Sequence, residues 1–379
     1  MDHPVQIDGL SPQATRILAP DTPTPARMMA ASGMAPLPPK ELITVLYALS
    51  FNGDTSLGDK ARATLAGLPD NILLETLSGP LQPGVLDGLA QLLIKKESAV
   101  ERLVLNHATA AETVMYITKR IQSEKILEII CANEARLLGH PEIIEALYFN
   151  KHSRMSSVDR AMELAIRNGI ELKGIPAFEE AKKALDGELI FEASDEPSPD
   201  DLMFQEAVQT AADPSIDDHK VEEALTAIDK DQHDEVDAET QDKVSTLSAS
   251  LSNMTVSQKI RTAMLGSASQ RSVLIRDANK LVIMSVLKSP GVNDSEVRRY
   301  SMLKSLPEEA VRFIANKREW TKQYSVKLNL VTNPRTPVEY SLRFMTHLRP
   351  NDLRTLERSK DIPGVIRNAA IELRRKRSK

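Results

Sequence analysis

The chain has 379 residues, of which 41% are hydrophobic and only 4% aromatic, and its formal net charge at pH 7 is −5. This length allows two or three domains that each bury a core, and the scarcity of aromatics means that aliphatic residues fill it. A single cysteine, Cys131, excludes an intramolecular disulfide and agrees with a reducing compartment.

Residues 1–38 contain seven prolines and show little hydrophobic periodicity. Such a segment cannot bury enough apolar surface to offset the entropy lost on ordering, so the sequence predicts a disordered arm. The sequence opens with MDHPV, which has no basic start and no apolar run, and no stretch of the chain approaches the roughly 18 apolar residues of a membrane span. We therefore expect a cytoplasmic protein without membrane insertion.

Residues 39–185 carry apolar residues at helical spacing, punctuated by prolines at turns. Strand patterns bounded by Asn-Gly or Asp-Gly turns are missing, which favours an all-α fold. We expect an N-terminal helical-repeat domain over this range. Its clearest stripes are Leu42, Leu46 and Leu49; Leu86, Leu89 and Leu93; and Ile126, Ile129 and Ile130.

An acidic segment follows, and we expect residues 186–253 to form a flexible linker. Between positions 186 and 242 there are 20 Asp or Glu against two Lys, a net charge of −18. A run of like charges repels itself and is usually solvated. Two islands have the spacing of short amphipathic helices, and each is either a transient helix or docks on a groove of this chain or of a partner. They are Leu202, Phe204 and Val208, and Val221, Leu225 and Ile228.

Residues 254–379 reverse the sign, with 26 Lys or Arg against 11 Asp or Glu, a net charge of +15. We expect a basic C-terminal helical-repeat domain. Its charge would attract nucleic acid, although cations at helical spacing are also typical of a solvated ridge. The acidic linker is itself a polyanion, so we consider an intramolecular latch in which it covers the basic block and competes with nucleic acid.

A pattern that occurs twice, 183 positions apart, links the two blocks. Asn106, Asn133 and Asn150 are separated by 27 and then 17 residues. Ser289, Asn316 and Asn333 repeat that spacing without gaps. A constant register is typical of stacked helical hairpins, which must present their apolar faces at the same place. The sequence therefore predicts two α-solenoid blocks joined by the acidic, largely disordered linker.

Helix starts and ends are predicted from turn chemistry. We expect Asn106 and Asn333 to adopt the left-handed conformation that closes a helix. Five segments have the form of a capping box, in which a hydroxyl and a Glu or Gln three residues later satisfy two amides reciprocally. They begin at Ser98, Thr109, Thr255, Ser305 and Thr336.

Two C-terminal stretches carry a resemblance to known repeats. Residues 330–339 (LVTNPRTPVE) are similar to the turn of leucine-rich-repeat variants, and residues 361–370 (DIPGVIRNAA) to the turn and helix of HEAT-like units. Residues 274–290 are similar to C-terminal modules of uncharacterised bacterial proteins built from such repeats. The chain thus resembles bacterial HEAT-like or leucine-rich-repeat-variant helical-repeat proteins over 39–175 and 255–379. The resemblance implies a stacked helical fold and no activity. The cysteine cluster of some variant-repeat proteins is absent, so no iron–sulfur centre is implied.

Candidate binding residues lie in two clusters of the basic block. In the first, aromatics among cations suit either bases and phosphates or a protein partner, although Trp320 is equally suited to the repeat core. The second is the basic end of the sequence. The candidates are Lys317, Arg318, Trp320, Lys322, Tyr324, Arg374, Arg375 and Arg377.

Motifs for catalysis, cofactors or metals are missing from the sequence. The histidines lack metal-ligand spacing, and residues 229–235 lack the glycine and terminal glutamate of a calcium loop. Phosphate loops and seryl elbows are absent as well. We therefore expect no enzyme, cofactor or metal, but a protein-binding scaffold or adaptor. The alternative is a nucleic-acid-associated protein that binds through the basic block, gated by the acidic linker.

Overall fold

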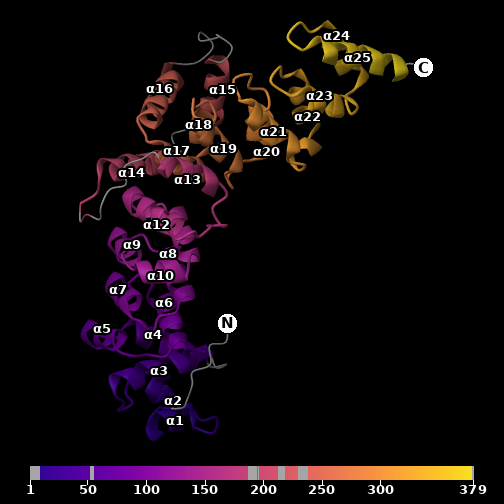
Figure 1. Ribbon diagram of the computed structural model, residues 1–379. Coiled ribbons are helices and arrows are strands. Elements are labelled where there is room, and N and C mark those ends of the chain that lie inside the picture. Colours follow the sequence, from indigo (N-terminus) through magenta and orange to yellow (C-terminus); the bar gives the residue numbers. More distant parts are fainter. Residues whose placement is uncertain are drawn as a thin grey trace. The chain divides into compact units, whose positions relative to one another are not determined.

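A computed structural model of the chain describes residues 9–51, 55–186, 194, 196–211, 218–228 and 238–377. Every regular element in these ranges is a helix, so the predicted all-α class is confirmed (Figure 1). The chain divides into two compact units, residues 1–172 and 173–379. Among the described helices, none combines the length and hydropathy required to traverse a bilayer.

The first unit consists of short helices in two rows. Helices α5, α7 and α9 contact one another in sequence, and so do α4, α6, α8 and α11 (Figure 1). The helices are α1 (Pro12–Leu18), α2 (Thr24–Ala31), α3 (Pro39–Ser50), α4 (Thr55–Ala66), α5 (Asp70–Ser78), α6 (Pro83–Leu93), α7 (Glu97–Leu105), α8 (Ala111–Thr118), α9 (Glu124–Cys131), α10 (Glu134–Gly139), α11 (Glu142–Phe149) and α12 (Met155–Arg167).

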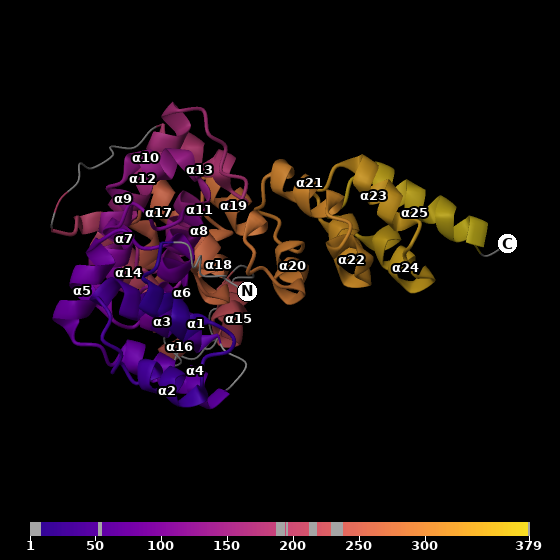
Figure 2. The same cartoon turned by 90° about the horizontal axis from the view of Figure 1, so that it is seen from below.

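The second unit continues with short helices. Toward its C-terminal part, α20, α22 and α24 follow one side and α21, α23 and α25 the other (Figure 2). The helices are α13 (Phe178–Leu185), α14 (Pro199–Ala211), α15 (Asp218–Ile228), α16 (Ala238–Ser252), α17 (Val256–Leu265), α18 (Ala268–Leu274), α19 (Lys280–Lys288), α20 (Asp294–Tyr300), α21 (Glu308–Asn316), η2 (Trp320–Lys322), α22 (Tyr324–Thr332), α23 (Val338–Met345), α24 (Pro350–Arg358) and α25 (Gly364–Arg377).

The proline-rich segment differs from its predicted disorder over residues 9–38. Prolines stand in the first turns of α1 and α2, where a missing N–H has no cost. Small residues then let both helices pack closely on α3, and Ala14, Ala30 and Ala31 are fully buried. The Ser11 hydroxyl caps α1 and also bonds the carboxylate of Glu41. Residues 1–8 lie outside the described part.

The predicted boundary at residue 185 is also corrected, because α13 belongs to the second unit. Its apolar face, including Phe178 and Leu185, is buried against α17 and α19. The Lys288 ammonium binds both carboxylate oxygens of Glu180, at 2.7 and 2.8 Å. The first block therefore ends before α13.

The acidic linker, predicted to be flexible, is largely part of the second unit's fold. Helix α14 packs on α17, and α15 and α16 pack on α18. Phe204 of the first island is fully buried, as the docking alternative requires, whereas Leu202 is 54% exposed. Val221 and Leu225 of the second island are buried. The docking alternative is thus confirmed for the described residues, while residues 229–235, the rejected calcium loop, lie outside them.

Polar contacts explain why so acidic a segment can dock. The carboxylate of Asp218 accepts bonds from the backbone N–H (3.0 Å) and the hydroxyl of Ser269, in the first turn of α18. Glu222 accepts a bond from Ser272 and lies 2.9 Å from the Arg299 guanidinium. Anions are stabilised at a helix N-terminus and beside a cation, so the contacts of the exposed Asp218 and of the buried Glu222 favour docking.

Three buried asparagines, Asn106, Asn150 and Asn333, each follow the last residue of a helix and make the same contacts. The amide nitrogen donates to two carbonyls 27 to 32 residues earlier, while Oδ1 accepts from the N–H two residues ahead, at 2.8 to 2.9 Å. We call this the asparagine clamp. Its carbonyls are Leu77 (2.6 Å) and Gly79 (2.9 Å), Thr118 (2.6 Å) and Ile121 (2.9 Å), and Ser301 (3.2 Å) and Leu303 (3.0 Å), respectively.

The left-handed conformation predicted for Asn106 and Asn333 is wrong. The φ angles of Asn106, Asn150 and Asn333 are −73°, −81° and −78°, which is extended rather than left-handed backbone. Asparagine is needed because its amide supplies two donors and one acceptor. The predicted equivalence of Asn133 and Asn316 is not seen, since Asn133 caps α10 and Asn316 is the last residue of α21.

Position 289 holds a serine, which lacks the two amide donors. Its hydroxyl accepts only from the N–H of Gly291, at 3.3 Å. At this turn the Arg271 guanidinium bridges two carbonyls instead, donating to those of Gly266 (2.8 Å) and Gly291 (3.0 Å). The guanidinium is held by Glu296 through two bonds of 2.8 and 3.1 Å. A buried ion pair thus replaces the clamp.

Glu296 has two further roles inside the second unit. It completes a capping box with Asn293 at the start of α20. It also accepts a 3.0 Å bond from the hydroxyl of Tyr300. Burial first, and then the negative charge of Glu296, raise the pKa of Tyr300 well above its ordinary value.

Of the five predicted capping boxes, the one at Thr255 is confirmed. Two others, at Ser267 and Asn293, were not predicted. The Thr109 hydroxyl instead donates to the carbonyl of Leu103, at 2.6 Å. The remaining predictions, at Ser98, Thr109, Ser305 and Thr336, are wrong because α7, α8, α21 and α23 begin at Glu97, Ala111, Glu308 and Val338, respectively.

Candidate interaction surface

Trp320, an expected partner contact or core residue, belongs to the core. It is 5% exposed, and its ring meets that of Phe313 edge-on at 6.0 Å. The Lys317 ammonium lies 3.9 Å from the centre of the indole, as a cation–π contact requires. Arg318 and Lys322 are exposed beside it, so the first cluster offers cations but no exposed indole.

Tyr324 is half-buried and connects α22 to the start of α24. Its hydroxyl donates to the carboxylate of Asp352 and accepts from the N–H of Arg349 at 2.9 Å. The Arg349 guanidinium lies 4.7 Å from the centre of the tyrosine ring. Burial, followed by the bond to Asp352, raises the pKa of Tyr324. The hydroxyl and the ring of Tyr324 are therefore both engaged by residues of the same unit.

An arginine of α25 contacts the turn at 346–349, which lies between α23 and α24. Arg377 donates to the carbonyls of Leu348 (2.5 Å) and Thr346, just beyond the end of α23. Arg374 pairs with Glu357 of α24, and Arg375 is exposed. Arginine at a helix C-terminus satisfies free carbonyls and opposes the helix dipole. Arg374 and Arg377 thus have a structural role.

These contacts join the two predicted clusters at one end of the C-terminal helices, through the turn at 346–349. Arg349 and Lys376 also lie there and were missed, although the turn residue Arg349 precedes a helix-starting proline and could have been noticed. We define the basic end by its exposed cations. They are Arg318, Lys322, Arg349, Arg375, Lys376 and Arg377.

The basic end retains positive charge. Among the described residues, Arg318, Lys322 and Lys376 form no ion pair with a carboxylate. Exposed acids nearby in the sequence are Glu319 and Glu372. The described part of the acidic segment contacts the basic block at α17, α18 and α20, with Asp218 bonded to Ser269 and Glu222 paired with Arg299, so a latch over this block stays a prediction.

The opposite end of the same helices is apolar. The Lys304–Asp361 ion pair (3.1 Å) and the Asn333 clamp bring the three turns there together. We define the apolar end by its exposed hydrophobic residues. They are Met302 (53% exposed), Val338 (38%), Leu342 (38%) and Val365 (59%).

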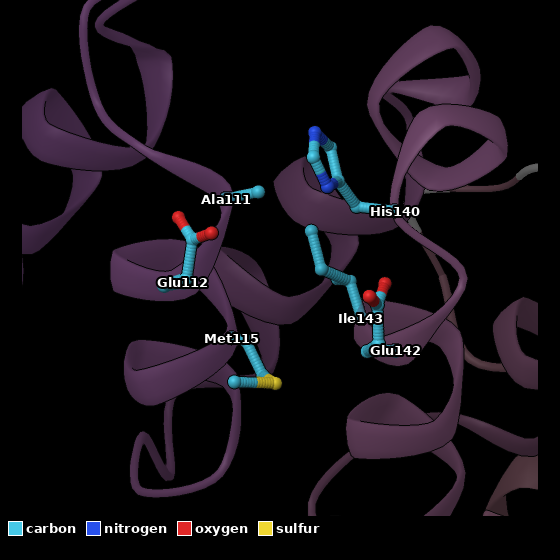
Figure 3. Close-up of a pocket in the computed structure, with 6 residues that line it drawn as sticks. All are labelled: Ala111, Glu112, Met115, His140, Glu142 and Ile143. Atoms are coloured by element: carbon cyan, nitrogen blue, oxygen red, sulfur yellow. The ribbon is translucent and has the colours of Figure 1, made fainter.

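Hollows in the two units have different sizes. In the first unit, a cavity of about 50 Å³ separates Glu112 and Met115 of α8 from His140 and Glu142 (Figure 3). Its volume suits a few water molecules. An open groove of about 780 Å³ in the second unit is lined by α14 and α16. In the described ranges, no three His, Cys, Asp or Glu side chains are grouped so as to hold a metal ion.

Comparison with protein-family models, curated proteins and solved structures finds no match to this chain.

Proposed function

We propose that the protein is a non-enzymatic protein-binding scaffold made of two α-solenoid blocks of the HEAT-like kind. The asparagine clamp supports this arrangement, because the same contacts tie successive turns at Asn106, Asn150 and Asn333. Stacked repeats leave extended faces free for a partner.

The apolar end carries the proposal. Val338 and Leu342 lie one turn apart on α23, and Met302 and Val365 stand on the neighbouring turns. Apolar residues that gather on a surface mark protein contacts more often than residues scattered singly. The partner is therefore a protein that offers an apolar patch to this end.

A pull-down with a tagged full-length chain tests the proposal. After nuclease treatment, we expect a defined protein to be retained, and Val338→Lys with Leu342→Lys to reduce its recovery by about tenfold or more. Met29→Lys with Met34→Lys is the matched control, since it adds the same charge at exposed apolar positions of the first unit. Circular dichroism checks that both variants fold. Recovery of no protein, or equal recovery with both variants, would contradict the proposal.

A further inference from the structure

We infer that the basic end is a second, separate binding surface, which takes the phosphate backbone of a nucleic-acid duplex. The scaffold proposed above depends on the apolar end, whereas this inference depends on residues at the other end of the same helices.

The basic end lacks the free aromatic side chains that other ligands would use. Trp320 is buried, and the hydroxyl and ring of Tyr324 are occupied by Asp352 and Arg349. Protein interfaces are enriched in aromatic anchors that fill pockets of the partner, and single-stranded nucleic acid is bound by stacking bases on aromatics. A duplex hides its bases and presents phosphates, which cations bind without such anchors.

The cations of the basic end stand at the ends of several neighbouring helices. Arg318 and Lys322 precede α22, Arg349 precedes α24, and Lys376 is near the end of α25. Packed helices are about 10 Å apart, so the cations are distributed over several steps of that length. A duplex carries one charge per about 1.7 Å of its axis, so a surface of this width faces several phosphates at once.

The cations at this end differ in whether they already have partners within the protein. Arg377 and Arg374 are engaged with carbonyls and with Glu357, which accounts for them without a ligand. Arg318 and Lys322 are exposed, and the described residues hold no carboxylate in ion-pair contact with them. These two side chains are therefore free to bind phosphate.

The test measures anisotropy of a fluorescein-labelled, mixed-sequence DNA duplex of about 20 base pairs with full-length protein over a series of NaCl concentrations. For Arg318→Ala with Lys322→Ala, we expect binding to weaken about tenfold at low salt and the slope of log K against log [NaCl] to fall in magnitude by about 2. The matched control is Arg335→Ala with Lys360→Ala. It removes two exposed cations of the turns at the apolar end, and we expect the wild-type slope.

Further arms separate the alternatives. An RNA duplex of the same sequence is expected to bind through the same two residues, and polyglutamate at equal charge is expected not to displace DNA. Tighter binding of polyglutamate than of DNA would assign the surface to an acidic protein and overturn the inference. An equal loss of DNA binding in both double variants, or no DNA binding at low salt, would overturn it as well. The Val338→Lys, Leu342→Lys variant should bind the duplex at least as tightly as wild type. Loss of the protein partner in this variant with duplex binding unchanged would show that the two proposals stand or fall separately.

Discussion

The turns at Asn150 and Ser289 both contain a side chain that bridges two backbone carbonyls, but the two side chains differ in charge. At Asn150, in the first unit, a neutral side-chain amide bridges the carbonyls of Thr118 and Ile121. At Ser289, in the second unit, the bridge is the Arg271 guanidinium, held by Glu296. An amide is desolvated at modest cost, whereas a buried ion pair is stable only when both partners are present. The second solution should therefore be more sensitive to loss of one residue.

Among truncations to alanine, loss of Glu296 is expected to have the largest effect on stability. Glu296→Ala leaves the Arg271 charge buried without its partner, and we expect the second unit to lose about 3–5 kcal/mol of unfolding free energy. Hydrogen exchange monitored by mass spectrometry can assign the loss to residues 173–379. Glu309→Ala, at an exposed position of α21, should change stability by about 0.5 kcal/mol or less. Equal effects of the two substitutions would show that the ion pair is not what holds this turn.

Truncation at the two turns sharpens the comparison. Asn150→Ala removes two donors from buried carbonyls, so we expect a loss of about 2–4 kcal/mol in the first unit. Ser289→Ala removes one long bond to Gly291, and we expect about 1 kcal/mol or less. The same exchange measurement on both variants decides the order. A larger effect at Ser289 would reverse our assignment of the bridges.

Substitution of Tyr47 is expected to have the smallest effect on stability near neutral pH and a distinct effect in alkali. Its hydroxyl is buried and has no hydrogen-bond partner among the residues that the structure describes, so Tyr47→Phe should change stability by about 1 kcal/mol or less. Burial, followed by the charge of Asp87, raises the pKa of Tyr47 from 10.0 to about 12. The unfolded phenol therefore ionises first, and the first unit should lose stability as pH rises from 10 toward 12. Urea unfolding of wild type and Tyr47→Phe over this range should show a shallower decline for the variant; parallel declines would contradict the shift.

The sequence predicted the helical class and the importance of Asn106, Asn150 and Asn333, because spacing and residue type are visible in one chain. Their mechanism was wrong, since the partner carbonyls are about 30 residues away and backbone preference alone suggested a left-handed turn. The acidic segment was misjudged for a related reason. Its net charge indicated solvation, but docking depends on Ser269 and Arg299, whose positions only the fold supplies.

The candidate surface was predicted in part. The cations of both clusters could be recognised from composition, but their meeting at one end depends on the contacts of Tyr324 and Arg377 with the turn at 346–349. Trp320 could not be assigned to the core from sequence, because aromatics among cations suit a surface equally well.

The most direct test of the clamp compares Asn150→Asp with Asn133→Asp. At Asn150 the change keeps the acceptor for His152 but turns a carboxylate toward two carbonyls, whereas at Asn133 it only exchanges one good N-cap for another. We expect Asn150→Asp to reduce the unfolding free energy of the first unit by about 3–5 kcal/mol, and Asn133→Asp to change it by about 0.5 kcal/mol or less. Equal, small effects would contradict the claim that the amide of Asn150 ties successive helical repeats together.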